Sequence, residues 1–300
     1  MASDVVAVIP AAGSGSRLQP ITKAVPKEML PLVDRPLIDY AVREACDAGI
    51  RQFVIVRGPR GQVIEDYLKE ELGTTAASGG HVTAPSVPAL TTGIPEFNYV
   101  HQDTPLGLGH AILASRPIVG ARAMAVLLVD DVILSQPSCL QQLIDVFQAT
   151  QESVIGLYGV SGDEAEKYGI AWGKRVDVNS RRKVYKLDGL VEKPSRDRLH
   201  SQWKHEGRYL SVMGRYVLRA ELFPILESLP IGRNNEIQLT DGIQRLLGTR
   251  KVYGVVFEGD RVDAGDRQGY LRASIEIGLR RDDTAPALQE YVRLKIRNES

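Results

Sequence analysis

The chain has 300 residues, of which 43% are hydrophobic, enough to bury the core of one large α/β domain. Its 37 lysines and arginines balance 37 aspartates and glutamates, so no bulk positive charge favours a nucleic-acid partner. The two cysteines, Cys46 and Cys139, belong to no Cys/His cluster with zinc spacing. A disulfide framework is therefore not expected, which is typical of a reducing compartment.

No apolar run is long enough to cross a membrane, so we expect no membrane partner. The first apolar run begins at Asp4, and no basic segment with a small-residue cleavage site precedes it. The sequence therefore predicts a cytoplasmic protein.

The first half alternates short apolar, β-branched runs with stretches whose apolar residues repeat at helical spacing. The predicted strands are 4–9, 52–56, 97–100, 123–129 and 153–157. The predicted helices are 36–48, 62–70, 109–116 and 139–148. The first of these helices has Pro36 in its first turn and Gly49 as its C-terminal cap. This alternation predicts an α/β fold with a doubly wound, mainly parallel sheet and helices on both faces.

The second half has longer, partly alternating strand patterns and then helices. Its predicted strands are 170–176, 183–191, 209–218 and 251–257. Its predicted helices are 220–229, 236–247 and one from about Gly269, and the charged tail 281–300 follows as a further helix or an irregular segment. We expect the two halves to merge into one domain with a mixed sheet, because no flexible linker separates them.

The segment Gly73–Pro95 has no periodicity and is rich in glycine, threonine, serine, alanine and proline. A surface loop is the favoured interpretation, and a lid over a bound nucleotide is the alternative.

The first predicted strand runs into the glycine-rich segment AAGSGSR. Small residues let the backbone approach a ligand closely, and glycines permit the positive φ angles that aim N–H groups at an anion. Arg17 adds a cationic fork for phosphate oxygens. The residues predicted to bind nucleotide phosphates are Ala11, Ala12, Gly13, Gly15 and Ser16. Alone, such a segment is more often a structural strand-to-helix turn than a nucleotide-binding loop.

Two better-known phosphate loops are excluded. Leu18 occupies the position where the dinucleotide fingerprint needs its third glycine, and the Gly-Lys-Ser/Thr of triphosphate hydrolases is absent. Asp130 follows the apolar run 123–129, so it should lie at the carboxyl end of a strand, where ligands bind in open α/β sheets. A carboxylate there can hold Mg²⁺, although isolated acids after strands are often helix caps.

Read together, eight segments resemble the bacterial UTP–glucose-1-phosphate uridylyltransferases, within the wider sugar-nucleotide pyrophosphorylases. They are AAGSGSRLQPITKAVPKEMLPLVDRPLIDY (11–40), HQDTPLGLGHA (101–111), LLVDDVI (127–133), EKYGI (166–170), LVEKP (190–194), MGRYVL (213–218), NEIQLTD (235–241) and VDAGDRQGYL (262–271). They span nearly the whole chain in the order of the family. The resemblance implies a Rossmann-like nucleotidyltransferase fold, with a nucleotide-binding half (1–160) and a β-rich sugar-phosphate-binding half (161–280).

The resemblance also implies the roles of residues around the nucleotide. Arg17 and Lys27 neutralise the triphosphate. Gln102 pairs with the edge of the uracil, and Gly107 offers its backbone to the same base. Judged alone, Lys27 would be a solvated surface residue and Gln102 an ordinary polar residue after a strand.

In the family, two aspartates from distant segments hold Mg²⁺ between them and the substrate phosphates. They correspond here to Asp130 and Asp263, with Asp131 as the competing candidate.

The residues implied to bind the sugar 1-phosphate are Gly169, Glu192, Lys193 and Gly214. Glu192 binds sugar hydroxyls and Lys193 meets the phosphate, whereas alone they would be a surface ion pair before a turn proline. Glu236 is interpreted as mainly structural and near the sugar pocket.

The implied reaction is in-line attack of the sugar 1-phosphate on the α-phosphorus of UTP, which gives a UDP-sugar, with UDP-glucose favoured, and pyrophosphate. The attacking phosphate is already anionic, so no general base is needed, in agreement with the lack of a nucleophile–base motif among five histidines. The resemblance further implies a homo-oligomer.

Several positions depart from the family. Tyr209 replaces a common asparagine near the sugar, Asn235 a glycine, and Ala264 a cysteine beside the second metal aspartate. Another nucleotide, or another sugar or cyclitol 1-phosphate, is therefore an alternative substrate. A metal-dependent glycosyltransferase is disfavoured because the acids at Asp130 are adjacent rather than spaced as Asp-x-Asp. A non-catalytic sensor is disfavoured because the charged residues of the site are retained.

Overall fold

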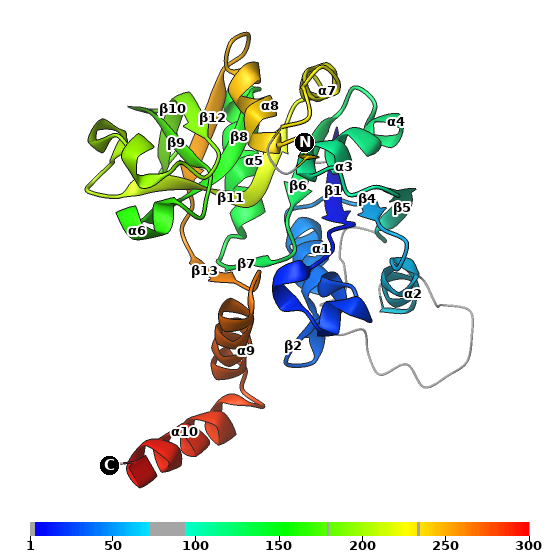
Figure 1. Cartoon of the computed structure of the whole chain (residues 1–300), viewed down its shortest axis with the longest axis vertical. Coiled ribbons are helices and arrows are strands. Elements are labelled where there is room, and N and C mark those ends of the chain that lie inside the picture. Colours follow the sequence, from blue (N-terminus) through cyan, green and yellow to red (C-terminus); the bar gives the residue numbers. More distant parts are fainter. Residues whose placement is uncertain (1–3, 72–93, 179, 233–234, 300) are drawn as a thin grey trace.

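The computed structural model describes residues 4–71, 94–178, 180–232 and 235–299 (Figure 1). Its centre is a nine-stranded sheet in the order β5-β4-β1-β6-β11-β8-β12-β10-β9. All of these strands except β10 and β11 run in the same direction. From edge to edge the strands are β5 (Glu96–His101), β4 (Gln52–Arg57), β1 (Val5–Ala11), β6 (Ala123–Leu127), β11 (Tyr209–Leu218), β8 (Ser153–Val160), β12 (Val252–Val256), β10 (Lys183–Val191) and β9 (Ile170–Val176).

Helices cover both faces of the sheet, which confirms the prediction of a doubly wound, mainly parallel α/β fold. In β1, Val5, Ala7 and Ile9 pack into one core while Val6 and Val8 pack into the other, so the strand is apolar throughout. The first core is covered by α1 (Leu37–Asp47), α2 (Gln62–Glu71) and α5 (Cys139–Thr150). The second is covered by α3 (Leu108–Ala114), α4 (Arg116–Val119), α7 (Leu222–Glu227) and α8 (Leu239–Leu246).

Two predicted helices differ from the structure. The predicted helix 109–116 is broken between α3 and α4 at Ser115, just before Pro117, which lacks the N–H that a continuous helix requires. The predicted helix 236–247 begins only at Leu239. The preceding backbone pairs instead with the loop before α3, through Ile237 N to Leu106 O at 2.8 Å and Gly109 N to Ile237 O at 2.8 Å.

The predicted strand 123–129 is also too long. Strand β6 ends at Leu127, and the chain then turns, with Asp131 N bonded to Leu128 O at 3.4 Å. A second strand, β7 (Asp131–Leu134), begins immediately and pairs antiparallel with β13 (Asp260–Asp263). This small sheet was not predicted, and it brings two segments together that lie far apart in the sequence.

The remaining elements are short, apart from two helices at the C-terminus. The short ones are η2 (Ser16–Leu18), η3 (Ile21–Lys23), η4 (Lys27–Met29), β2 (Pro31–Leu32), β3 (Arg35–Pro36), α6 (Gly162–Ala165), η5 (Arg196–Arg198) and η6 (Ser201–Trp203). Helices α9 (Arg267–Arg280) and α10 (Ala285–Glu299) project from the body of the molecule (Figure 1).

The predicted loop Gly73–Pro95 lies, except for its last two residues, outside the described part of the chain. Every helix of the described residues is too short or too polar to span a bilayer.

Candidate active site

Two cavities meet at the carboxyl ends of the central parallel strands. The larger, of about 440 Å³, and the smaller, of about 260 Å³, share Arg17, Asp130 and Gln238 in their walls. The predicted nucleotide-binding residues that line the larger cavity are Ala12, Gly13, Gly15, Ser16, Lys27, Gln102 and Gly107. Ala11 lines an adjoining hollow, whereas Asp263 and the predicted sugar-binding residues line the smaller cavity. The structure thus brings all predicted site residues to one edge of the sheet; the ligands they bind stay a prediction.

The glycine-rich loop after β1 has one obligatory glycine. Gly15 adopts a φ of 63°, and a Cβ there would lie 2.9 Å from Cγ2 of Thr22. The hydroxyl of Thr22 donates to Gly15 O at 2.8 Å, and Leu18 is buried at the start of the following turn. Contacts with Thr22 and the burial of Leu18 therefore stabilise the loop from the side of the protein interior. The loop also lines the larger cavity.

Lys27 and Asp130 form the charged junction of the two cavities. The distance from Nζ of Lys27 to Oδ2 of Asp130 is 2.9 Å, and Nη2 of Arg17 lies 3.8 Å from the same oxygen. Burial raises the pKa of Asp130, but Lys27 and Arg17 together with a backbone hydrogen bond outweigh this effect, so the pKa lies below its usual value. Burial likewise lowers the pKa of Lys27, and Asp130 and Glu28 together raise it above its usual value. Both groups are thus charged at neutral pH.

The small β7–β13 sheet brings the second predicted metal aspartate to this junction. Asp263 lies opposite Asp131 in the register of the two strands. Its Oδ1 accepts from Gly265 N at 2.9 Å, and its Oδ2 accepts from Nη2 of Arg261 at 2.9 Å. A Cβ added to Gly265 would lie 2.9 Å from Oδ1 of Asp263 and 3.3 Å from Oδ2 of Asp130. Gly265 therefore keeps open a space that two carboxylates from distant segments face.

This pair fits a hard divalent cation. Mg²⁺ is commonly held by one or two carboxylates while phosphates and water complete its octahedron. Within the described ranges, no group of three or more Asp, Glu, His or Cys side chains is placed to hold a metal ion. Asp131 has both oxygens engaged inside the protein, by Nε of Arg261 at 2.6 Å and Gly214 N at 2.9 Å. Asp263 has both oxygens engaged as well, so these contacts do not separate the two candidates.

The smaller cavity is built around Glu192 and Lys193. Oε2 of Glu192 accepts from Oγ1 of Thr240 at 2.7 Å, and a Cβ on Gly169 would lie 3.2 Å from the same oxygen. Lys193 has a φ of 40°, a conformation costly for a residue with a side chain, and strain of this kind concentrates at functional sites. Nζ of Lys193 is 3.5 Å from Oε1 of Glu192, and the side chain is 57% exposed, so it is accessible to a ligand.

Gln102 and Gly107 line the larger cavity and not the smaller one. Gln102 is buried after β5, and its Nε2 lies 2.7 Å from Nδ1 of His110. Gly107 adopts a φ of 93°, and a Cβ there would lie 2.7 Å from Cβ of Glu236. Packing alone therefore requires a glycine at position 107. Glu236 lines this cavity and not the smaller one, and its place near the sugar pocket stays a prediction.

Among the polar residues of the smaller cavity that the sequence analysis missed are Tyr168, Thr240 and Arg261. Tyr168 and Thr240 lie inside the quoted segments EKYGI and NEIQLTD, and Arg261 directly precedes VDAGDRQGYL. Their spacing carried no signal, because each acts through a contact with a distant segment.

Two departures from the family are explained by packing. Tyr209 packs against the buried Val160, Ala165 and Ile170 and does not line the smaller cavity. Asn235 has a φ of 61°, which asparagine tolerates better than most residues with a side chain.

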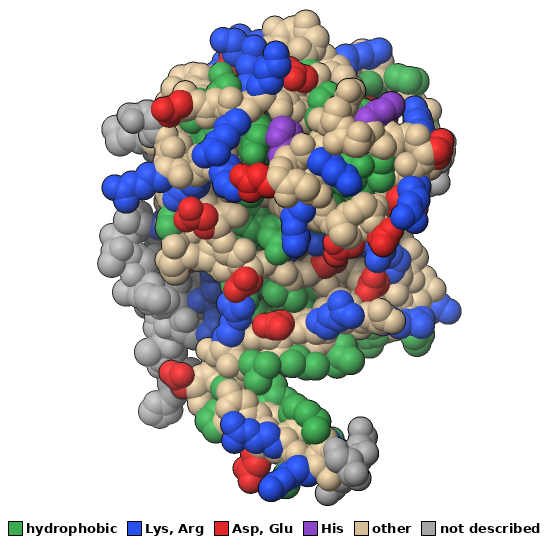
Figure 2. Space-filling view, turned by 90° about the vertical axis from the view of Figure 1, so that its left-hand side faces the viewer, with side chains coloured by type: hydrophobic (Ala, Val, Ile, Leu, Met, Phe, Trp, Pro, Cys, Tyr) green, Lys and Arg blue, Asp and Glu red, His purple; other side chains and the backbone are tan. Residues whose placement is uncertain are grey.

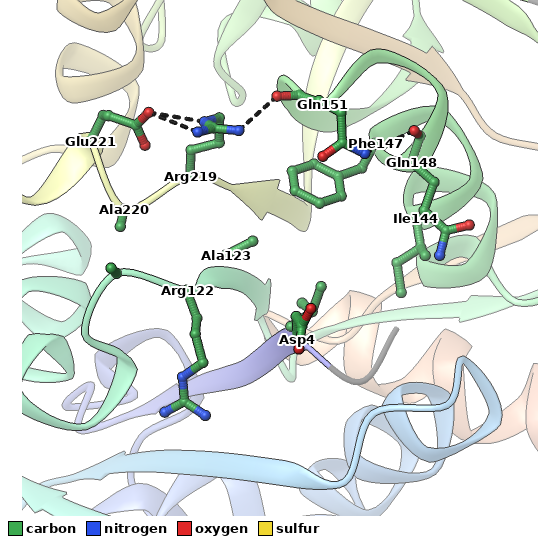
Figure 3. Close-up of a pocket in the computed structure, with 12 residues that line it drawn as sticks. Asp4, Arg122, Ala123, Ile144, Phe147, Gln148, Gln151, Arg219, Ala220 and Glu221 are labelled. Carbon is green, nitrogen blue, oxygen red and sulfur yellow. Dashed lines mark hydrogen bonds and ion pairs between the residues drawn. The ribbon is translucent and has the colours of Figure 1, made fainter. Parts of the chain in front are cut away.

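A further hollow of about 350 Å³ lies at the opposite, amino edge of β1 and β6 (Figure 3). Its Arg219 is engaged by Glu221 and by Gln151 O, and its Arg122 points away from the hollow and bonds Gln52. Both arginines of this hollow thus bind groups of the protein itself. The hollow is similar in size to the two cavities described above, so size alone does not identify the site.

The sequence model of the family named Nucleotidyl transferase matches residues 6–278. The chain therefore belongs to this family.

Its similar relatives place it among the bacterial UTP–glucose-1-phosphate uridylyltransferases. The chain is 38% identical to UTP–glucose-1-phosphate uridylyltransferase YngB of Bacillus subtilis (strain 168), with 98% of this chain and 96% of that relative covered. It is 37% identical to UTP–glucose-1-phosphate uridylyltransferase of Staphylococcus epidermidis, with 96% of both chains covered.

Solved structures of UDP-glucose pyrophosphorylases are also similar to this chain. A UDP-glucose pyrophosphorylase complexed with UDP-glucose matches with a TM-score of 0.81 and 36% identity, over 92% of this chain and 99% of that one. A UTP-bound enzyme from Acinetobacter baumannii matches with a TM-score of 0.76 and 30% identity, over 96% of this chain and 98% of that one.

Glu28, next to Lys27, generates a testable pH dependence. The side chain is fully buried, and neither carboxyl oxygen has a hydrogen-bond partner among the described residues. Burial raises the pKa of Glu28 from 4.5 to about 7, although Lys27 opposes the shift. Between pH 4.5 and about pH 7 the folded protein therefore binds more protons than the unfolded chain. The free energy of unfolding falls as the pH rises through this range.

We expect Glu28→Gln to remove this fall in the free energy of unfolding with rising pH. Relative to the wild type, the gain in free energy of unfolding should be about 2 kcal/mol larger at about pH 8.5 than at about pH 5.5, measured by urea unfolding. Glu70→Gln, at an exposed position of α2, is the matched control and should show no such difference. An equal effect of Glu28→Gln at both pH values would contradict the assignment.

Proposed function

We propose that this chain is a UTP–glucose-1-phosphate uridylyltransferase, which forms UDP-glucose and pyrophosphate from UTP and glucose 1-phosphate. The observation that carries the proposal is the pair of joined cavities with Asp130 and Lys27 at their junction. Relatives with this activity in their names cover nearly the whole chain at 37–38% identity. Structures similar to this one hold UDP-glucose and UTP.

The larger cavity accommodates UTP in this proposal. The backbone from Ala11 to Ser16 follows the phosphates, while Arg17 and Lys27 neutralise their charge. Gln102 and Gly107 face the uracil. These residues support the proposal because Arg17 lines both cavities, whereas Gln102 and Gly107 line only the larger one.

Asp130 and Asp263 would hold Mg²⁺ in the space beside Gly265. When bound, the ion neutralises charge on the phosphates and helps to orient them. Oxygens of the substrate phosphates and water would complete its coordination.

The smaller cavity accommodates the sugar 1-phosphate. Glu192, oriented by Thr240, accepts hydrogen bonds from sugar hydroxyls, and the backbone at Gly169 and Gly214 lets the ring approach closely. Lys193 binds the phosphate and directs one of its oxygens toward the α-phosphorus of UTP.

The reaction is then an in-line displacement. An oxygen of the sugar 1-phosphate forms a bond to the α-phosphorus, and the bond from that phosphorus to the bridging oxygen of pyrophosphate breaks. Both substrates are anions, so the barrier lies in bringing them together and in the charge on the leaving group. Lys193 positions the attacking phosphate, and Arg17 and Lys27 neutralise charge on the triphosphate and on the leaving group. The reaction needs no general base.

We also propose that residues 1–280 form one domain, with its nucleotide half at 1–160 and its sugar half at 161–280. The sheet supports this because β11, from the second half, lies between β6 and β8 of the first. The free, buried thiols of Cys46 and Cys139 support a cytoplasmic location.

A homo-oligomer is the last part of the proposal. Leu271, Ile275 and Leu279 recur every four residues along α9 and are 61%, 38% and 36% exposed. Tyr291 and Leu294 on α10 are also more than half exposed. Figure 2 shows hydrophobic side chains gathered along this projection. A second copy of the chain covers this surface in the proposed assembly.

The proposed activity predicts a substrate preference. Pyrophosphate release should show the highest kcat/KM with UTP and glucose 1-phosphate in a panel of other triphosphates and sugar 1-phosphates. Chelation of Mg²⁺ should stop release, and excess Mg²⁺ should restore it. No release with any pair would refute an enzymatic role.

Lys193→Ala should lower turnover by about 10²-fold or more, because it removes a charge partner of the attacking phosphate. Lys174→Ala, an exposed lysine of the same half, is the control and should leave turnover unchanged. Near-normal turnover of a folded Lys193→Ala protein would exclude the proposed role.

The wild type should have at least the mass of a dimer in light scattering. The double substitution Leu271→Glu and Leu294→Glu should reduce the mass, since it places charge on the apolar surface, whereas Gln289→Glu should not. A monomeric wild type would disprove the proposed oligomer.

A further inference from the structure

We propose that His110 is a positioning residue that fixes the orientation of the Gln102 amide and thereby selects uracil over cytosine. The inference rests on the proposed function, in which Gln102 faces the base of UTP. It is carried by the contacts of one buried side chain.

The surroundings of Gln102 determine which end of its amide is the nitrogen. The residue is 5% exposed, and one end of the amide lies 3.4 Å from Gly107 O and 2.7 Å from Nδ1 of His110. A carbonyl oxygen can only accept, so an amide oxygen at this place would be repelled. The end beside Gly107 O is therefore the NH₂ group, Nε2.

This orientation also determines the state of His110. Nε2 of Gln102 has two protons to donate and no lone pair to offer, so Nδ1 of His110 must accept. The imidazole is then neutral, with its proton on Nε2. His110 thus holds the amide nitrogen without contacting the substrate itself.

The consequence falls on the opposite end of the amide. With Nε2 held by His110 and Gly107, the oxygen Oε1 is the group that meets a base, and no described residue donates to it. Uracil carries a proton on N3 and can donate to Oε1. Cytosine has a lone pair on N3, so two acceptors would face each other, and a buried acceptor without a partner is costly.

A structural role for His110 would predict something different. If His110 only supported α3, its loss would weaken UTP and CTP to the same extent. If it orients the amide, its loss leaves only the longer contact of 3.4 Å with Gly107 O to hold Nε2, so Gln102 turns over more readily and donates from Nε2 to N3 of cytosine. Discrimination then falls while turnover persists.

The test compares kcat/KM for UTP and for CTP, with glucose 1-phosphate and Mg²⁺. The wild type should prefer UTP by about 10²-fold or more. His110→Leu should reduce this ratio by about 10-fold, with the change mainly in KM, since the amide contacts the base and not the reacting phosphorus. His110→Asn, whose Oδ1 can accept near the place of Nδ1, should restore the ratio to within about threefold of the wild type.

His200→Leu is the matched control, because His200 is exposed and lies against Trp203, outside both cavities. If His110→Leu does not fold, His110→Ala removes the ring without adding bulk and carries the same expectation. A folded His110→Leu or His110→Ala protein that keeps the full UTP preference would overturn the role of His110 alone. A wild type that does not distinguish UTP from CTP would overturn it together with the assignment of Gln102 to the base.

Discussion

The active edge of the sheet depends on Arg215, a fully buried cation at the place where β11 meets the end of β6. Its Nε donates to Glu44 of α1 at 2.8 Å, and its other nitrogens donate to Leu128 O, Gly214 O and Asp131 O at 2.7–2.9 Å. Breaking a buried pair of this kind typically costs about 3–5 kcal/mol, because the remaining charge loses its compensation. One guanidinium thus fixes the turn that carries Asp130 and Asp131.

This turn separates two adjacent acids into different roles. Asp130 faces Lys27, while Asp131 faces Arg261 and the backbone of Gly214. Each carboxylate therefore has its own cation before any substrate arrives, so little reorganisation is needed when further charge enters the site. The adjacency that argued against an Asp-x-Asp motif in the sequence has this physical meaning: the two side chains pair with different cations.

Much of the fold could be predicted from periodicity. Strands β9, β10 and β11 have the predicted bounds, because their sequences are rich in apolar residues that alternate in part, and glycine or charged residues flank each strand. The β7–β13 sheet could not be predicted, since each strand has four residues and pairs across a separation of more than a hundred positions. For the same reason Asp263 was recognised by resemblance alone. Its partners Arg261 and Tyr168 were missed, because their hydrogen bonds depend on that pairing.

Tyr168 shows why these contacts matter to a two-substrate reaction. Its backbone oxygen accepts from Lys193 N at 3.2 Å, and its hydroxyl donates to Oδ2 of Asp263 at 3.1 Å. One residue therefore sets the spacing between the lysine proposed for the sugar phosphate and the aspartate proposed for the metal. In-line attack is sensitive to displacements of about 1 Å, so a short, direct connection is a better way to hold this spacing than two independent loops. The positive φ of Lys193 serves the same spacing. It lets the N–H of Lys193 bond to Tyr168 O while the side chain of Lys193 lines the smaller cavity.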